Sequence, residues 1–332
     1  MIGLDVGGAN CKAAVVDDHG RVRTVSEPFE VWRSPDDLAD AITSVIGRLG
    51  LNGASVALTT TAELVDVFDG KRAGVLHVLE AARRALPGRR LRVITTSGEL
   101  IELDRARAEP LACAAANWVA TALLVARSLP EAILVDCGGT TTDVIPIVGG
   151  QVAARGRTDL QRLLASELVY TGALRTNIAA VVPRVPIGGR PCPVSSELFA
   201  IAADAHLLRG SLDATRCTCS FPDGRGPEPE HVRARLARVV CADPDQLSAG
   251  DLDAIAGAVH DAQVAAIADA LARVAARCDP GTPVIAVGVG AFLAHAAAVR
   301  CALDVADPGA LALAGVAGEV AACVALSVLG RE

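Results

Sequence analysis

The chain has 332 residues, of which 52% are apolar and only 2% aromatic, and its net charge is −7 with an isoelectric point near 5.4. This length suits two ordinary domains or one large bilobal body, with a core packed by alanine, valine and leucine. Basic residues form no cluster interleaved with aromatic ones, which argues against nucleic acid as a partner.

Two stretches bear on membrane association. The first apolar run begins at Ile2, which leaves no room for a signal peptide, so we expect a cytoplasmic protein. The apolar stretch 310–330 is long enough to span a bilayer, but it contains Glu319, and a charge at mid-membrane costs at least about 2.5–3.5 kcal/mol. We therefore predict a buried helix there and no membrane partner.

The first part of the chain predicts an α/β lobe over residues 1–129. Its expected elements are strands at 2–6, 12–16 and 21–26, a helix that begins after Ser34, a strand at 55–58, a helix at 75–86, a strand at 91–95 and a helix from 110 to about 127. Ser34 is a suitable N-cap, and Pro35 suits the first helical position. Strands that alternate with helices are typical of an α/β fold.

The second part repeats this plan and predicts a second lobe over residues 130–332. Its expected elements are strands at 132–135, 143–148 and 151–154, a proline-rich insertion around 183–230, a helix at 259–278 and a strand at 284–287. A duplicated plan suggests two lobes that face across a cleft, with the last helix returning to the first lobe.

Two segments nearly repeat each other: Gly-Leu-Asp-Val-Gly-Gly-Ala-Asn at 3–10 and Val-Asp-Cys-Gly-Gly-Thr-Thr-Thr-Asp at 135–143. Paired glycines let backbone N–H groups approach an anion, and an Asp at a strand end can hold Mg²⁺. We therefore expect two loops that grip a di- or triphosphate, with Asp5 and Asp136 as the metal ligands. The other phosphate-binding candidates are Gly7, Gly8, Asn10, Lys12, Gly138, Gly139, Thr140, Thr141 and Thr142. Lys12 either neutralises a phosphate or points to solvent.

A third glycine turn follows the strand at 284–287. The sequence Gly288-Val289-Gly290 lies between this strand and a helical pattern, and it allows a flat ligand to approach the backbone closely.

The order of these three loops resembles the actin/sugar kinase/Hsp70 superfamily, and Asp-Cys-Gly-Gly-Thr-Thr-Thr-Asp looks especially like its hydantoinase/oxoprolinase branch. Further segments are similar to the short branch linked to tetrahydromethanopterin-dependent one-carbon metabolism. These segments are 59–66 (Thr-Thr-Thr-Ala-Glu-Leu-Val-Asp), 116–118 (Ala-Asn-Trp), 167–177 (Glu-Leu-Val-Tyr-Thr-Gly-Ala-Leu-Arg-Thr-Asn), 196–197 (Ser-Glu) and 223–225 (Asp-Gly-Arg).

The resemblance implies an α/β, two-lobed, actin-like ATPase fold built from duplicated ribonuclease H-like lobes around a central cleft. It also implies an activity of methanofuran biosynthesis, in which the phenol of γ-glutamyltyramine displaces pyrophosphate from aminomethylfuran diphosphate. Mg²⁺ is then the expected cofactor, and ATP is not required. The Ala- and Arg-rich composition suggests a bacterial methylotroph that makes the related methylofuran from a different tyrosine-derived acceptor.

This chemistry needs a base, because a phenol has a pKa near about 10. Asp143 and Glu63 are the candidate bases, and Asp136 is the third catalytic candidate. The remaining candidates for substrate binding are Asn117, Arg157, Asp159, Arg175, Asn177, Gly288 and Gly290. Four of the candidates have a structural alternative: a turn for Asp143, a helix start for Glu63, a solvated face for Arg157 and a buried hydrogen bond for Asn117.

Two other functions are compatible with the same fold. One is an ATP-dependent hydantoinase-like hydrolase or small-molecule kinase, which would bind and turn over ATP. The other is a non-catalytic, nucleotide-switching protein, which would polymerise or capture a partner. The favoured function needs only small-molecule substrates, and a homodimer is compatible with it. The six histidines form no ligand set and are expected on the surface or in the core, and Cys217-Thr218-Cys219 is expected to be a loop.

Overall fold

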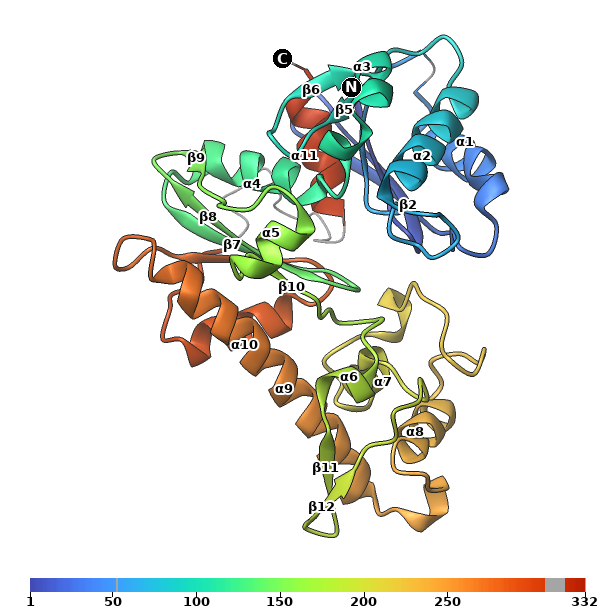
Figure 1. Cartoon of the computed structure of the whole chain (residues 1–332), viewed down its shortest axis with the longest axis vertical. Coiled ribbons are helices and arrows are strands. Elements are labelled where there is room, and N and C mark those ends of the chain that lie inside the picture. The colour runs from blue at the N-terminus through green and yellow to red at the C-terminus, as the bar shows by residue number, and fades with distance from the viewer. Residues whose placement is uncertain (52, 308–319, 332) are drawn as a thin grey trace. The chain divides into compact units, whose positions relative to one another are not determined.

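The computed structural model describes residues 1–51, 53–307 and 320–331 (Figure 1). The chain divides into two compact units. Unit 1 comprises Met1–Leu134, Ile145–Ala165 and Asp307–Glu332, and unit 2 comprises Val135–Val144 and Ser166–Ala306. The lobe boundary expected at residue 129 stays a prediction.

Unit 1 contains a six-stranded sheet with the order β3-β2-β1-β4-β5-β6. Its strands are β1 (Ile2–Val6), β2 (Asn10–Val16), β3 (Val22–Pro28), β4 (Val56–Thr60), β5 (Leu91–Ile94) and β6 (Leu100–Glu102). Strand β1 pairs antiparallel with β2 and parallel with β4, so it lies at the centre of the sheet with every residue buried. The expected meander of three strands is confirmed.

Helices accompany this sheet in the described part of unit 1, and some of them contact its strands. They are α1 (Leu38–Arg48), α2 (Lys71–Ala85), α3 (Leu103–Ala108), α4 (Asn117–Ser128), α5 (Asp159–Leu164) and α11 (Ala321–Leu329). Leu38, Ile42, Val45 and Ile46 are buried at helical spacing on α1, and burying each such side chain contributes roughly 1.5–3 kcal/mol. The turn before α1, Pro35–Asp37, is a 3₁₀ helix, so the expected helix begins with one tighter turn.

The C-terminal helix α11 packs on β1 and β2 (Figure 1). A Cβ on Gly3 would lie 1.8 Å from the Cys323 carbonyl oxygen, so only glycine allows this approach. The Ser327 hydroxyl donates to the Met1 carbonyl over 2.9 Å and accepts from the Val16 N–H over 3.0 Å. The expected buried helix is therefore confirmed for 321–329, whereas 310–319, with Glu319, lies outside the described residues. No helix in the described ranges is long and apolar enough to cross a membrane.

The long helix expected from 110 to 127 is wrong in one respect. A 3₁₀ helix (Pro110–Cys113) comes first, and α4 begins only at Asn117. Between them Ala115 has a φ of +50°, a left-handed conformation that interrupts any helix. Local propensity could not reveal this break, because alanine is the best helix former.

The second sheet has the order β10-β8-β7-β13, with β9 paired to β8. Its strands are β7 (Ala132–Cys137), β8 (Thr142–Val148), β9 (Gln151–Val152), β10 (Leu168–Val169) and β13 (Val284–Val287). The division between the units falls within β7 and β8. The expected strands at 132–135, 143–148 and 284–287 are confirmed, and the glycine turn after β13 leads into α10 (Ala291–Arg300) as expected.

The rest of unit 2 is mostly helical. Its elements are α6 (Ile178–Val181), β11 (Arg184–Ile187), β12 (Arg190–Pro193), α7 (Ala202–Leu208), α8 (Pro229–Arg238) and α9 (Ala249–Ala275). Helix α9 begins ten residues before the expected start, at a capping box in which the Ser248 hydroxyl and the Asp251 carboxylate accept each other's backbone N–H.

The proline-rich stretch 183–230 is more than turns, because it contains the β11–β12 hairpin and α7. Arg235 of α8 holds this stretch in place: it is fully buried and donates to Asp204 over 2.8 Å and to Asp223 over 2.9 Å. Arg235 also lies over the Phe221 ring at 4.1 Å. The Asp-Gly-Arg segment noted in the sequence thus supplies Asp223 as a structural partner.

Candidate functional site

The first glycine loop of unit 1 is a tight hairpin that places Asp5 beside it. The Gly7 N–H donates to the Asn10 carbonyl over 2.9 Å and closes the turn between β1 and β2. Asp5 is 7% exposed, and its Oδ1 accepts no hydrogen bond from the described residues. Burial raises the pKa of Asp5, while Lys12, its cross-strand partner, opposes the shift.

The surroundings of Asp5 are rich in oxygen atoms. Thr59 pairs with Asp5 from β4, and Asn10 begins β2. The Thr59 hydroxyl and Asn10 Oδ1 are also buried without a hydrogen-bond partner in the described part of the chain. Buried oxygens of this kind fit a hard cation or its bound water, and Mg²⁺ in particular keeps several waters and substrate phosphates as ligands. Asp5 therefore fits as one protein ligand of Mg²⁺.

The segment 61–65 lies beside this loop and carries Glu63. The Thr61 N–H donates to the Val6 carbonyl over 3.0 Å, and a Cβ on Gly8 would lie 3.0 Å from Val65 Cγ1. On the other side, a Cβ on Gly74 of α2 would lie 2.6 Å from Glu63 Cα. Unit 1 thus brings Asp5, its glycine loop and Glu63 into one region.

Glu63 has the properties of a general base. It is 1% exposed, and its Oε2 has no hydrogen-bond partner among the residues the structure describes. Burial raises the pKa of Glu63 to about 7, opposed by the backbone N–H groups of Glu63 and Ala115 and by Lys71, while Asp159 adds to the rise. A carboxyl with a pKa near the working pH suits proton transfer. The left-handed Ala115 places its N–H where Glu63 can accept it.

One further predicted residue, Asp159, lies in this region of unit 1. Asp159 forms an ion pair with Lys71 and lies 3.6 Å from Arg162 Nη1. Arg162 is buried, with its guanidinium 4.4 Å from the centre of the Trp118 ring. Asp159 is therefore held from both sides.

Arg157 and Asn117 have less constrained surroundings. Arg157 is exposed and donates to the Thr96 carbonyl over 3.1 Å. Asn117 is half-buried and is the first residue of α4, directly before Trp118. Their roles in substrate binding stay predictions.

Sequence reasoning did not identify Lys71 as a candidate site residue. Nothing in the sequence pairs Lys71 with Asp159, 88 residues away. The available signal was its position, because the free N–H groups at the start of a helix such as α2 disfavour a cation.

The second glycine loop, in unit 2, is clamped by the segment 172–175. The Gly138 N–H donates to the Thr141 carbonyl over 2.9 Å. The Gly139 carbonyl accepts from the N–H groups of both Leu174 and Arg175, over 3.0 and 2.8 Å. A Cβ on Gly172 would lie 2.5 Å from the Thr140 nitrogen, so glycine is required there.

The third glycine turn packs against the same loop. Gly288 has a φ of +94°, and a Cβ there would lie 2.2 Å from the Cys137 carbonyl oxygen and 2.8 Å from Asp136 Oδ1. The Gly290 N–H donates to the Cys137 carbonyl over 2.8 Å, and a Cβ on Gly290 would lie 2.4 Å from Cys137 Sγ. Unit 2 therefore brings Asp136, Gly288 and Gly290 together. Burial raises the pKa of Cys137, and likewise that of Cys11 in unit 1, to about 12.

Gln263 supports the second loop from inside unit 2. This fully buried side chain donates to the Thr171 hydroxyl over 2.8 Å and to the Gly172 carbonyl over 2.9 Å. Its Oε1 lies 2.8 Å from Nε2 of His206, which is also fully buried. His206 is therefore a core histidine, as expected, and the described residues contain no cluster of histidine, cysteine and acidic residues that could hold a metal ion.

Three predicted residues of unit 2 make structural contacts. The Thr142 hydroxyl donates to the Thr171 carbonyl over 2.8 Å, and the Asn177 side chain caps α6 by accepting from the Ala179 N–H over 3.0 Å. Asp143 is buried in β8 opposite Leu168, so it is a strand residue and the turn alternative is wrong. The expectation that the two glycine loops share one ligand stays a prediction.

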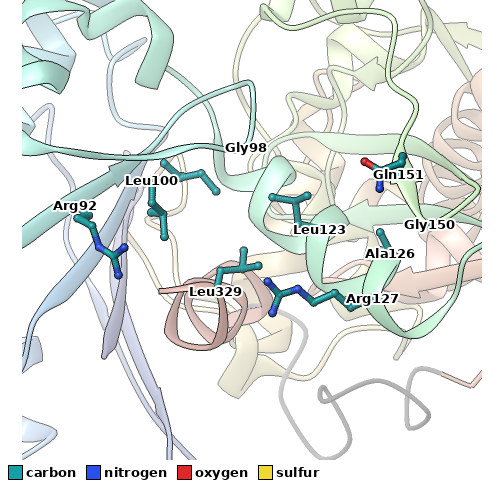
Figure 2. Close-up of a pocket in the computed structure, with 10 residues that line it drawn as sticks. Arg92, Gly98, Leu100, Leu123, Ala126, Arg127, Gly150, Gln151 and Leu329 are labelled. Carbon is teal, nitrogen blue, oxygen red and sulfur yellow. The ribbon is translucent and has the colours of Figure 1, made fainter. Parts of the chain in front are cut away.

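A separate cavity of about 480 Å³ in unit 1 contains none of the predicted site residues (Figure 2). Its lining residues are Arg92, Ile94, Gly98, Leu100, Leu123, Ala126, Arg127, Gly150, Gln151 and Leu329. Figure 2 shows the two arginine side chains on opposite sides of Leu329. The cavity lies at the C-terminal end of α4, where Arg127 is about 15 Å along the helix axis from Asn117.

The fold is the two-lobed, actin-like ATPase fold of the α/β class. A solved structure of ethanolamine utilization protein EutJ from Carboxydothermus hydrogenoformans matches with a TM-score of 0.50 and 16% identity, covering 99% of this chain and 89% of that one. The family model for hydantoinase/oxoprolinase matches residues 55–328, and the chain belongs to this family.

Two curated relatives carry the same name, (4-{4-[2-(gamma-L-glutamylamino)ethyl]phenoxymethyl}furan-2-yl)methanamine synthase. The protein from Methanocaldococcus jannaschii is 33% identical over 292 residues, which cover 87% of this chain and 86% of the relative. The protein from Methanococcus vannielii is 40% identical over 119 residues, which cover 36% of this chain and 53% of the relative. The resemblance to the methanofuran branch, stated from motifs, is confirmed.

Proposed function

We propose that this chain is a synthase of methanofuran-type cofactors that forms an aryl ether, in which a phenol displaces pyrophosphate from aminomethylfuran diphosphate. The observation that carries the proposal is the 33% identity to the Methanocaldococcus jannaschii synthase over nearly the full length of both chains. The name of that relative describes a phenoxymethyl-furan, which is the aryl ether such a reaction makes. The similarity to this relative supports a synthase over a hydantoinase-like hydrolase, a kinase or a nucleotide switch.

The proposed reaction is a nucleophilic displacement at the furfuryl carbon. The phenol gives its proton to the Glu63 carboxylate, and its oxygen forms a bond to the CH₂ group of the furan. The bond between that carbon and the diphosphate oxygen breaks, and its electron pair leaves with pyrophosphate. The buried position of Glu63 and its pKa of about 7 support its role as the base.

The glycine loops support binding of the diphosphate in this proposal. Mg²⁺, when bound, neutralises charge on the leaving pyrophosphate, and Asp5 and Asp136 are its proposed ligands. Backbone N–H groups of the loops add hydrogen bonds where negative charge develops. ATP is not required for this reaction. The protein is proposed to act in the cytoplasm on small molecules, and a methylofuran precursor is the alternative acceptor.

The test is a direct assay of the purified protein with aminomethylfuran diphosphate, γ-glutamyltyramine and Mg²⁺. Release of pyrophosphate in step with an ether product of the expected mass supports the proposal. A parallel reaction with tyramine and with tyrosine identifies the acceptor class. Hydrolysis of ATP that depends on a hydantoin or a sugar, without ether formation, would overturn the proposal in favour of the other enzymes of this fold.

A further inference from the structure

Lys71 is a cation in a position that local physics disfavours. It is the first residue of α2, where the unpaired N–H groups of the helix repel positive charge. Its side chain is 28% exposed, and its ammonium group forms an ion pair with Asp159. A charge that is unfavourable for its own helix, but is stabilised by an ion pair with a residue distant in the sequence, is typical of functional positions.

The backbone of α2 lies directly against Glu63, and Lys71 is on the same face. Gly74 follows Lys71 by one helical turn, and a Cβ on Gly74 would lie 2.6 Å from Glu63 Cα and 2.8 Å from the Glu63 carbonyl oxygen. The field of the Lys71 ammonium acts on the Glu63 carboxylate. The buried carboxylate and the partly exposed ammonium are therefore neighbours, and Lys71 is the more exposed of the two.

Asp159 keeps the Lys71 ammonium in place. The Thr158 hydroxyl accepts the Gln161 N–H in a capping box that fixes the start of α5, on which Asp159 is the first residue. Arg162 Nη1 lies 3.6 Å from Asp159 Oδ1, and the Arg162 guanidinium lies over Trp118. The Asp159 carboxylate therefore has a defined position.

We propose that Lys71 is a catalytic residue whose ammonium group binds the phenolate oxygen of the acceptor while Glu63 takes the proton, and that Asp159 is its positioning residue. The inference rests on the proposed function. The reaction needs such a cation, because a phenol has a pKa near about 10 and transfer of its proton to a group of pKa about 7 is unfavourable by about 1,000-fold. An ammonium beside the phenolate reduces this penalty. The proton moves to Glu63, and the phenolate oxygen then attacks the furfuryl carbon as pyrophosphate leaves.

The first test compares Lys71→Met with Arg72→Met, which removes one positive charge from the next, exposed position of the same helix. We expect Lys71→Met to lower kcat/KM with γ-glutamyltyramine by about 100-fold, the usual effect of losing one group that stabilises a developing oxyanion. Lys71→Arg retains most of the rate, and Arg72→Met leaves it unchanged. Ring-fluorinated acceptors ionise more easily, so the loss in Lys71→Met becomes smaller as the acceptor's pKa falls.

The second test uses the acid limb of the pH profile of kcat/KM, which reports ionisation of Glu63. Lys71 and Asp159 are the charged groups whose fields act on Glu63 among the described residues, and they act in opposite directions. Lys71→Met therefore moves this limb to higher pH, and Asp159→Asn moves it to lower pH. General damage to the fold would not produce opposite movements.

The outcomes separate this inference from the proposed function. If the unmodified protein forms no ether, the proposed function fails. If it is active but Lys71→Met behaves like Arg72→Met, or if the loss is equal for all acceptors, Lys71 has no role in acceptor ionisation. Should Lys71→Met fold poorly by circular dichroism, Lys71→Gln and the Asp159→Asn profile give the same decision.

Discussion

Replacement of Glu63 by glutamine is expected to make the protein more stable and inactive. Glu63 is buried, and burial keeps its pKa at about 7 against an ordinary value of 4.5. Between these two values the folded chain holds a proton that the unfolded chain has released. The free energy of unfolding therefore falls as the pH rises from 4.5 to 7.

The size of the effect follows from the two pKa values. Their difference corresponds to about 3 kcal/mol, because each pKa unit is worth about 1.4 kcal/mol. Glutamine is neutral at every pH and avoids this cost. Glu63→Gln should therefore be about 3 kcal/mol more stable than the unmodified protein at pH 8, with the advantage falling to near zero below pH 4.5.

Urea unfolding at a series of pH values measures this difference. The two tryptophans, Trp32 and Trp118, both belong to unit 1, so their fluorescence reports the unit that contains Glu63. Glu109→Gln is the control, because Glu109 is an exposed carboxyl whose loss should change stability by less than about 1 kcal/mol at all pH values. Turnover should fall by at least about 100-fold in Glu63→Gln. Equal stability of Glu63→Gln and the unmodified protein at pH 8 would refute the buried-base argument, and so would normal turnover.

Three further changes test the other parts of the site. Asp136→Asn should lower turnover by at least about 100-fold at saturating Mg²⁺ with an unchanged circular dichroism spectrum, and normal turnover would contradict the proposed role of Asp136 as a metal ligand. Gln263→Met should cost about 2–3 kcal/mol in urea unfolding, because it leaves Nε2 of His206 buried without its partner; a cost below about 0.5 kcal/mol would contradict that network. Gly290→Ala should raise the KM for the diphosphate substrate, since its Cβ would lie 2.4 Å from Cys137 Sγ, and Cys137→Ala should partly restore it; no change in KM with Gly290→Ala would show that the turn does not position the loop.

The sequence predicted those parts of the fold that depend on neighbouring residues. The β1–β2 hairpin follows from an apolar run on each side of Gly7-Gly8, and the turn at Gly288 follows from the same kind of signal after β13. Both are set by local periodicity and by glycine's freedom at turns.

The parts that sequence reasoning missed depend on distant contacts. Ala115 lies in an alanine-rich run that favours a helix, and only tertiary packing explains its left-handed conformation. The ion pair between Lys71 and Asp159 joins α2 to α5, which no periodic pattern connects. Glu63 was identified as a candidate base, but its elevated pKa depends on burial under α2, which a single sequence does not reveal.

The protonated state of Cys11 and Cys137 has a consequence for an enzyme that handles an alkylating agent. A furfuryl diphosphate reacts with any strong nucleophile, and a thiolate is a better one than a phenol. Each thiol belongs to one of the glycine loops or their strands, yet a pKa of about 12 leaves almost no thiolate at neutral pH. Burial thus protects both thiols from alkylation by the furfuryl diphosphate that we propose as the substrate, and we expect a substitution that exposes Cys137 to make turnover self-inactivating.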